Sequence, residues 1–308
     1  MIALRKCWDM IDWIRTLLKS ITGELNAPKA IWKLCYTTIG CISSLFSLAV
    51  LLKDLMGCDK LEIWVKENWI IAIIASLIIS CLHNRKKMTF YKNASNVDMR
   101  IEIRVRDIFW NRVATSYVIP TNTFFRTEMR DEYISPNSVQ GRFQLKYFKE
   151  DLPSLDSQIC ENLISQGIEG NLTSDRFGST KKYPIGTVAK IDHKGNHFYF
   201  IAINDVNESG KPINQSIENV NTALVSLTKA IKEFGHCDIL CIPLLGSGKA
   251  AIQEATKENV FQKIVDCFVD SNDKLVNELI ISINPKDYLD GKIDLIRMEK
   301  YLDYRCEF

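Results

Sequence analysis

Two uncharged apolar stretches near the start of this chain constrain its fold more than any other feature. The first runs from Leu34 to Leu52 and holds 19 residues, which as a helix would extend about 28 Å, enough to cross a bilayer. The second runs from Asn68 to Asn84 and is rich in Ile, Leu and Ala. We therefore expect two transmembrane helices, 34–52 and 68–84, within residues 31–84, joined by a short polar loop from Lys53 to Glu67. Two buried helices of a globular α-helical domain are the alternative.

Basic residues lie on the outer flanks of both stretches. Because Lys and Arg near a membrane crossing stay on the cytoplasmic side, both ends of the hairpin are expected to face the cytoplasm. Aromatic residues at the ends of the stretches, Trp32, Tyr36, Trp64 and Trp69, favour the bilayer because such rings sit at its interface. The flanking basic residues are Arg5, Lys6, Arg15, Lys19, Lys29 and Lys33 before the first stretch, and Arg85, Lys86, Lys87 and Lys92 after the second.

Residues 1–30 form a third N-terminal feature, an expected amphipathic helix. Apolar residues recur there at steps of three and four, from Leu4 to Ile21, and charged residues fall between them. The hydrophobic run starts too late and is too interrupted by charge for a secretory signal. Two positions stay open for this helix: the membrane surface, or the surface of a partner subunit.

Charge and cysteine content exclude several classes of protein. The 39 Lys and Arg residues nearly balance 37 Asp and Glu residues, for a net charge of +2, so no nucleic-acid partner is indicated. Ten cysteines are scattered, some of them inside the apolar stretches, which is not a disulfide framework. The four histidines form no cluster with ligand spacing, so we predict no metal site and no catalytic residue.

Residues 95–308 have the pattern of a mixed α/β domain. Strand-like and helix-like segments follow one another, which implies a largely parallel sheet with helices on both faces and ligands at the carboxyl ends of its strands. The predicted strands are Met99–Val105, Ser116–Ile119, Gly186–Asp192, His197–Ile203, Asp238–Pro243 and Glu278–Ile283, and the predicted helices are Asn214–Phe234 and Glu258–Val269.

The loop Leu244–Ala251, with the sequence LLGSGKAA, is the most informative of those that follow a strand. Gly246 and Gly248 allow the backbone to approach a ligand closely and can leave amide groups free for phosphate oxygens. A Walker A motif is excluded, because Pro243 stands at the first glycine position and Ala250 replaces the metal-binding hydroxyl residue.

The order of four short motifs resembles that of a macro domain. They are Asp107–Ile108 after one strand, VIPTN at Val118–Asn122, PIGTVAKI at Pro184–Ile191, and PLLGSGKAA at Pro243–Ala251. A two-helix membrane anchor ahead of such a domain is similar to the transmembrane macro effectors of bacterial Thoeris antiphage defence, as is the loop from Phe124 to Phe143, which contains SPNSVQGRF. The expected fold is an α/β macro domain preceded by a transmembrane hairpin.

The resemblance implies a binding site for an ADP-ribose derivative. Asp107 would accept from the adenine amino group beside the backbone of Ile108, Asn122 would face the distal ribose, and Phe124 would wall that sugar. Leu245, Gly246, Ser247, Gly248 and Lys249 would surround the diphosphate. Structural alternatives stay open: Asp107 as a helix cap or a partner of Arg104 or Arg106, Asn122 as a turn residue, Phe124 in core packing, and Lys249 in solvent.

The resemblance also implies a function. The chain would be a homo-oligomeric, multi-pass effector in the bacterial inner membrane, with no cofactor, that senses an ADP-ribose-based signal made by a TIR-domain partner. The signal is expected to be an amino-acid conjugate of ADP-ribose. Ligand binding would drive assembly of the hairpins, disrupt the membrane and halt the infected cell. A membrane-anchored ADP-ribosyl hydrolase and a scaffold with an empty pocket are the alternatives.

Overall fold

The structure is a computed structural model, and it forms two compact units that we describe separately. One unit holds residues up to Met88 together with Pro285–Gly291, and the other holds Thr89–Asn284 and Lys292–Phe308. The predicted helix over residues 1–30 lies almost entirely outside the described residues, as do Ser247, Gly248 and Lys249. The described residues are 27–57, 59–84, 88–110, 113–129, 133–175, 178–207, 211–235, 237–246, 255–271 and 273–307.

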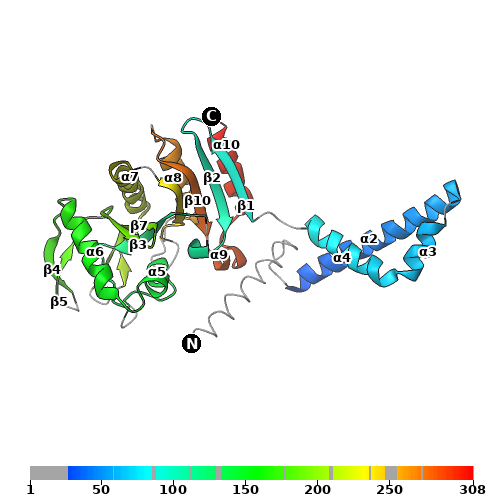
Figure 1. Ribbon diagram of the computed structural model, residues 1–308, viewed down its shortest axis with the longest axis horizontal. Helices are drawn as coiled ribbons and strands as arrows, with labels where there is room; N and C mark the ends of the chain where they lie inside the picture. Colours follow the sequence, from blue (N-terminus) through cyan, green and yellow to red (C-terminus); the bar gives the residue numbers. More distant parts are fainter. Residues whose placement is uncertain are drawn as a thin grey trace. The chain divides into compact units, whose positions relative to one another are not determined.

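An eight-stranded mixed sheet forms the centre of the larger unit (Figure 1). Its strand order is β1-β2-β10-β9-β3-β7-β6, with β8 paired to β7. The five strands from β2 to β7 in this order are mutually parallel, and β1 and β6 run antiparallel at the two edges. The strands are β1 (Thr89–Ala94), β2 (Met99–Val105), β3 (Ser116–Asn122), β6 (Val188–His193), β7 (Asn196–Val206), β8 (Pro212–Ile213), β9 (Cys237–Pro243) and β10 (Val276–Ile283).

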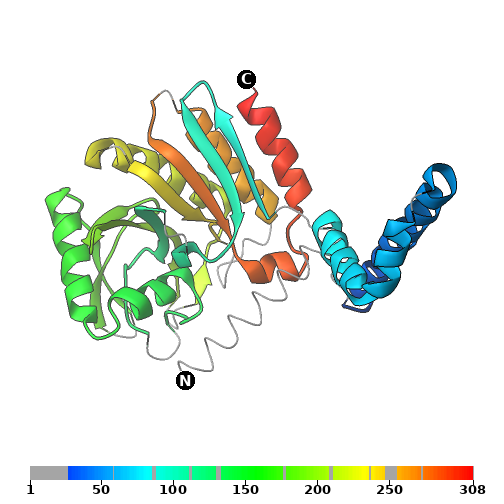
Figure 2. The same cartoon turned by 45° about the vertical axis from the view of Figure 1, so that its right-hand side comes forward.

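Helices cover both faces of this sheet, as the sequence predicts (Figure 2). The alternation of β7 shows how: Phe198 and Phe200 pack with Phe143 of α5, whereas Tyr199 between them contacts Phe234 of α7. Both faces are therefore apolar and buried, as expected for a central parallel strand. The helices are α5 (Val139–Tyr147) and α6 (Leu152–Ser165) on one face, and α7 (Ile217–Phe234), α8 (Lys257–Val269) and α10 (Leu295–Cys306) on the other; a 3-10 helix, η1 (Ile108–Trp110), follows β2.

The predicted hairpin around Lys194 and Gly195 is confirmed. Both residues have positive φ, +50° and +76°, and they join β6 to β7 as a two-residue turn whose twist matches paired strands. Gly235, the predicted helix stop, follows α7 with φ +99°. A second, separate hairpin of β4 (Asn171–Asp175) and β5 (Gly178–Lys182) has no alternating apolar pattern, so nothing in the sequence indicated it.

The other unit contains three helices and the short α9 (Pro285–Leu289). They are α2 (Ala27–Met56), α3 (Lys60–Glu67) and α4 (Trp69–Asn84). Helices α2 and α4 pack antiparallel, because Thr37 near the start of α2 bonds to Ser80 and Asn84 near the end of α4. By length and composition one described helix, Trp32–Leu55, is apolar enough to span a membrane, whereas α3 and α4 pass that test only as a pair bent by 93°.

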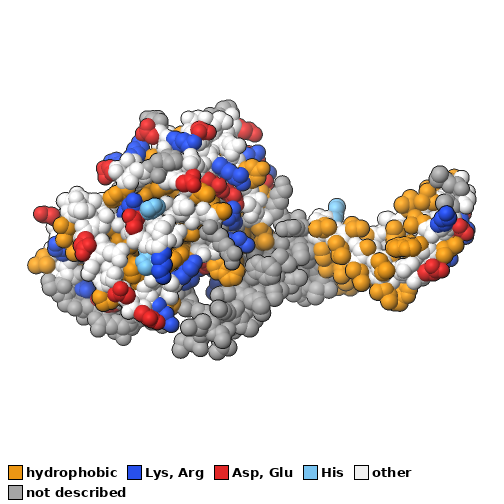
Figure 3. Space-filling model, viewed as in Figure 1, with side chains coloured by type: hydrophobic (Ala, Val, Ile, Leu, Met, Phe, Trp, Pro, Cys, Tyr) orange, Lys and Arg blue, Asp and Glu red, His pale blue; other side chains and the backbone are white. Residues whose placement is uncertain are grey.

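The segment between the two apolar stretches differs from the expected simple loop. Helix α2 continues to Met56, and Lys60–Glu67 is itself a helix. Several of the charged residues in this segment form ion pairs with one another. The Glu62 carboxylate lies 3.0 Å from the Lys53 ammonium and 2.5 Å from the ammonium of Lys66, one helical turn away. In Figure 3 charged side chains gather at this end of the helical unit, and apolar side chains cover most of the rest.

Candidate functional site

Five of the residues predicted from the sequence to form the site lie at the carboxyl ends of parallel strands, along one edge of the sheet. Asp107 and Ile108 follow β2, Asn122 ends β3, and Leu245 and Gly246 follow β9. Strand β10 lies between β2 and β9, and β3 lies on the other side of β9. In such a sheet, ligands bind at this edge because the loops there leave backbone amides and side chains unpaired by the ladder.

The Asp107 carboxylate is fixed by contacts on both of its oxygens. Oδ1 accepts a hydrogen bond from the Phe109 amide at 2.8 Å and so caps η1, and Oδ2 pairs with Arg142 of α5. The alternative that it caps a helix is thus confirmed, and the structure gives it Arg142 as an ion-pair partner, which was not among the expected partners. Ile108 is buried, with 2% of its surface exposed. About a quarter of the Asp107 side chain, 26%, stays exposed.

Helix α5 also holds the loop after Asp107 through a second cation. Lys146, one turn beyond Arg142, donates from Nζ to the Phe109 carbonyl at 2.8 Å. The guanidinium carbon of Arg142 and the ammonium of Lys146 lie 6.0 and 5.6 Å from the centre of the Phe109 ring. Three kinds of contact therefore join this loop to α5: a hydrogen bond to the backbone, an ion pair and cation–aromatic contacts.

Asn122 ends β3 at an irregularity in the sheet, where the register with β7 shifts between Thr121 and Asn122. The side-chain oxygen of Asn122, Oδ1, accepts a hydrogen bond from the Phe124 amide at 2.9 Å. The backbone carbonyl of Asn122 accepts a second one from the Phe125 amide at 3.1 Å, which continues the turn. Phe125 then adopts a φ of +51°. Asn122 was expected in the loop after the strand and is instead the last strand residue, so its side chain has a fixed place. The side-chain NH₂ group of Asn122 donates no hydrogen bond to any group in the described part of the chain.

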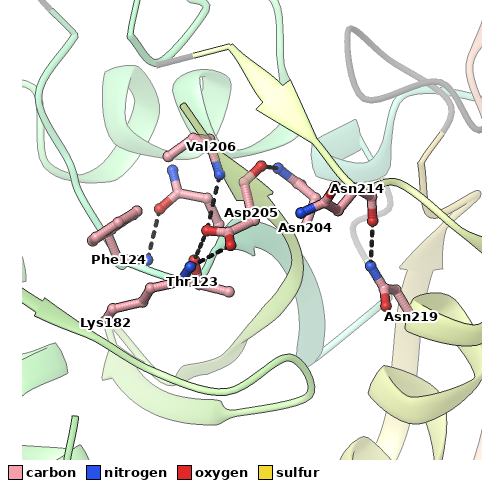
Figure 4. Close-up of polar contacts among 9 residues, drawn as sticks. Thr123, Phe124, Lys182, Asn204, Asp205, Val206, Asn214 and Asn219 are labelled. Carbon is pink, nitrogen blue, oxygen red and sulfur yellow. Dashed lines mark hydrogen bonds and ion pairs between the residues drawn. The ribbon is translucent and has the colours of Figure 1, made fainter. Parts of the chain in front are cut away.

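A compact polar cluster surrounds the turn after Asn122 (Figure 4). Asp205 of β7 accepts from the Thr123 hydroxyl at 2.7 Å and from the Val206 amide at 3.1 Å, and its second oxygen pairs with Lys182. Burial opposes ionisation of this carboxyl, yet the hydrogen bonds from Lys182 and Thr123 outweigh it, so the pKa of Asp205 lies below its usual value. The Lys182 ammonium also lies 5.8 Å from the centre of the Phe124 ring.

Two buried glutamines of α5 fix the chain beyond Phe125. Gln140 donates to the Arg126 carbonyl at 2.8 Å and Gln144 to the Thr127 carbonyl at 2.6 Å. The Thr121 hydroxyl of β3 donates to the side-chain oxygen of Gln140 at 3.0 Å. One helix therefore holds both the Asp107 loop and the loop after Asn122, on the two flanks of its buried Phe143.

The start of the glycine loop is placed at the same edge. Leu244 and Leu245 are buried, and Gly246 adopts φ +66°, a left-handed conformation that glycine adopts without strain. Ser247, Gly248 and Lys249 lie outside the described residues, so their expected contact with a diphosphate stays a prediction. Phe124 is half-buried against Tyr133 and its neighbours and lies beside Lys182.

Four residues at or beside this edge were not identified from sequence: Arg142, Lys182, Asn204 and Asp205. Asn204 pairs with Asn122 in the parallel register, and its amide donates to the Asp205 carbonyl at 2.9 Å. A signal for Asn204 and Asp205 exists, since two polar residues end a buried apolar run from Phe198 to Ile203. Arg142 and Lys182 come from elements without a clear periodicity, and only the fold brings them to the site.

The topology defines a mixed α/β domain with its candidate site at the carboxyl edge, and the comparisons assign the family. The model of the macro domain of Thoeris protein ThsA matches residues 101–284, and the chain belongs to this family. Thoeris protein ThsA of Bacillus amyloliquefaciens (strain Y2) is 24% identical over 149 residues, which cover 48% of each protein. The chain thus matches about half the length of this curated relative.

Among solved structures, similarity extends to macrodomains. A mutant macrodomain of Oceanobacillus iheyensis with ADPR aligns with a TM-score of 0.47 and 12% identity, over 71% of this chain and all of that one (100%). The macrodomain of Thermus aquaticus DarG aligns with a TM-score of 0.39 and 15% identity, over 59% of this chain and 98% of that one.

Proposed function

We propose that this protein is a membrane-anchored antiviral effector whose macro domain, within residues 95–308, binds an ADP-ribose-derived signal at the carboxyl edge of the sheet. A TIR-domain protein makes the signal, an amino-acid conjugate of ADP-ribose, and binding promotes assembly of the helical units in the inner membrane. The assembled helices disrupt the membrane and halt the infected cell.

The observation that carries the proposal is the convergence of three chemically suitable groups at one edge. A carboxylate at Asp107 suits an amino donor such as that of adenine, an amide at Asn122 suits a ribose hydroxyl, and a left-handed glycine at Gly246 opens a backbone suited to a diphosphate. Ile108 supplies backbone beside the base, and Phe124 and Leu245 supply apolar walls. Ser247, Gly248 and Lys249 complete the diphosphate site in this proposal.

The position of Asn122 supports its role in binding. Its oxygen is used by the Phe124 amide, which leaves the NH₂ group to donate to a hydroxyl oxygen of the ligand. The turn that uses this oxygen also orients the side chain, so little conformational entropy remains to be lost on binding. In this proposal Asn122 has both roles: its oxygen stabilises the turn, and its NH₂ group binds the ligand.

The composition of the helical unit supports the membrane anchor. Apolar side chains along α4 are exposed, whereas Ala72, Ser76 and Ser80 are buried against α2. Close packing through small and polar residues, with aliphatic side chains outward, is the arrangement that a lipid environment favours. In the proposal α2 and α4 are the two spans, and α3 lies at the surface between them.

Titration calorimetry of the full chain in detergent micelles tests the binding role, with ADP-ribose as the probe. Asn122→Asp keeps an oxygen for the Phe124 amide but removes the NH₂ donor and adds a charge, so affinity is expected to fall at least tenfold. Asn162→Asp is the matched control, because the Asn162 oxygen likewise accepts from a backbone amide, that of Lys190 at 2.8 Å, but on α6. The control is expected to bind like the unaltered protein.

Equal affinity of the Asn122→Asp and Asn162→Asp variants would contradict the assigned site, and no heat with millimolar ADP-ribose would contradict the binding function. The same preparation separates a receptor from a hydrolase. Stoichiometric binding without release of ADP-ribose from an ADP-ribosylated protein supports the receptor, and sustained turnover supports the enzyme.

A further inference from the structure

The contact between Asp107 and Arg142 links the candidate site to α5 in a way that the proposed function does not use. Arg142 lies on the flank of α5 next to the Asp107 loop, and its side chain is 28% exposed. Resting on the proposed function, we infer that Arg142 is the positioning residue that sets base specificity, by holding the Asp107 carboxylate toward an exocyclic amino group.

The carboxylate has the capacity for this role. An ionised carboxylate offers about four acceptor positions. The Phe109 amide uses one on Oδ1 and Arg142 uses one on Oδ2. Both oxygens are therefore held in place, while each keeps a lone pair for an amino hydrogen of the base. A base with a carbonyl at the same position would present an oxygen to the carboxylate and would be disfavoured by repulsion.

Helix α5 is a rigid platform for Arg142 without help from Arg142 itself. Ser138 caps the helix by accepting from the Gly141 amide at 3.0 Å, and Phe143 is fully buried in the core. A side chain at Gly141 would overlap the Ser135 carbonyl, so the start of the helix packs directly on the preceding turn. Gln140 and Gln144 hold the other flank. Replacing Arg142 is expected to leave this helix in place.

Losing Arg142 would leave Asp107 with one fixed oxygen. The carboxylate would then rotate about its remaining contact with the Phe109 amide and turn toward water, since a quarter of its side chain is already exposed. Adenine would lose a charge-assisted hydrogen bond, and the competing carbonyl base would lose its repulsion. Affinities for the two bases therefore converge, which a simple loss of stability would not cause.

The test compares ADP-ribose with the hypoxanthine analogue, inosine diphosphate ribose, by calorimetry on the full chain. The unaltered protein is expected to prefer adenine by at least tenfold. Arg142→Gln is expected to reduce this ratio to about threefold or less, and Arg142→Lys, which keeps a cation, to recover part of it. A base-preference ratio in Arg142→Gln equal to that of the unaltered protein would overturn the inference.

Lys146→Gln is the matched control. Lys146 is a cation on the same flank one turn away and binds the same loop, but through the Phe109 carbonyl and not through Asp107. Its variant is expected to change both affinities equally and to leave the base-preference ratio unchanged.

The double variant Arg142→Gln with Asp107→Asn should show the same ratio as Asp107→Asn alone, because Arg142 acts through Asp107. Binding of neither nucleotide by the unaltered protein would overturn the proposed function itself, whereas adenine preference retained in Arg142→Gln overturns only the role of Arg142.

Discussion

The two units of this protein use the same residue types in opposite places. In the α/β unit Ile101, Ile103 and Ile281 are fully buried, and the buried carboxylate of β2, that of Glu102, pairs with Arg100 and Arg104. In the helical unit Ile71 and Ile78 are more than half exposed, and the buried groups of α4 are Ala72, Ser76 and Ser80. Removal of apolar side chains from water accounts for the first arrangement. The second is the arrangement that the proposed membrane anchor requires, because lipid tails are as apolar as the exposed side chains.

A matched pair of substitutions tests this reversal and has the largest expected effect. Ile281→Asn places an amide in the centre of β10 and is expected to lower the free energy of unfolding by about 3–5 kcal/mol, through lost packing and a buried polar group. Ile78→Asn on the exposed face of α4 is expected to change α/β-unit unfolding by less than about 0.5 kcal/mol and to reduce membrane insertion instead.

Urea titrations followed by circular dichroism in detergent, together with the fraction of protein recovered in membranes, measure both effects. Strong destabilisation of the α/β unit by Ile78→Asn, with membrane recovery unchanged, would show that the exposed face of α4 does not meet lipid.

The next prediction concerns how α5 joins the core to the site. Gly141→Ala is expected to cost about 1–3 kcal/mol, because the new Cβ meets the Ser135 carbonyl and the backbone has to shift. Since α5 holds both site loops, ADP-ribose affinity should fall as well. Thermal unfolding and calorimetry check the two effects, with Gly195→Ala in the exposed β6–β7 turn as a control that strains φ without touching α5. If the Gly141→Ala variant is destabilised but binds ADP-ribose with unchanged affinity, α5 does not position the ligand-binding loops.

The Asp205 cluster gives a pH-dependent effect of intermediate size. The pKa of Asp205 is lower in the folded than in the unfolded protein, so the ionised carboxylate stabilises the fold. This contribution to stability is complete above the unfolded-state pKa and is lost as the pH falls through the folded-state pKa. Asp205→Asn is expected to cost about 1–2 kcal/mol at pH 7 and little in strong acid. Unfolding midpoints measured from pH 7 down to pH 3 check this, and a cost independent of pH would exclude an ionised Asp205 as its source.

The smallest expected effect lies between α2 and α4. Thr37→Val removes the hydroxyl that contacts Ser80 and accepts from Asn84 at 3.0 Å. If α2 and α4 span the membrane as proposed, the expected loss is about 0.6 kcal/mol, because hydrogen bonds between membrane helices are worth little. Unfolding of the helical unit in an SDS titration measures it. Thr38→Val is the control, since the Thr38 hydroxyl bonds within α2 to the Leu34 carbonyl at 2.7 Å. Equal effects of the two variants would show that the contact with α4 adds nothing.

The pattern of apolar residues predicted the central strands of the sheet and some of its helices. The central strands, the hairpin around Lys194 and helices α7 and α8 were found, because burial on both faces or on one helical stripe leaves a clear pattern. Edge strand β1 and helix α5 were not, and neither were α6 and α10, although α6 buries a regular stripe of Leu155, Ile159 and Leu163 and α10 one that includes Leu295, Met298 and Leu302. In β1 most side chains are exposed, and α5 buries Gln140 and Gln144 where a pattern search expects apolar residues.

The candidate site divides in the same way. Asp107, Asn122 and Gly246 follow predicted strands, so their meeting at one edge was predictable from topology alone. Arg142 and Lys182 were not predictable, because their contacts with Asp107 and Asp205 span 35 and 23 residues and depend on where α5 and the β4–β5 hairpin pack. Neither position carries a local signal that separates it from an ordinary surface cation.

Hydrogen–deuterium exchange of the full chain, with and without ADP-ribose, tests the central claim most directly. The account predicts slower exchange in residues 107–110, 122–127 and 244–246, which lie at the carboxyl edge, and unchanged exchange in β1 and at the Lys194–Gly195 turn. Protection at that turn or along β1, with the three edge segments unaffected, would contradict the account.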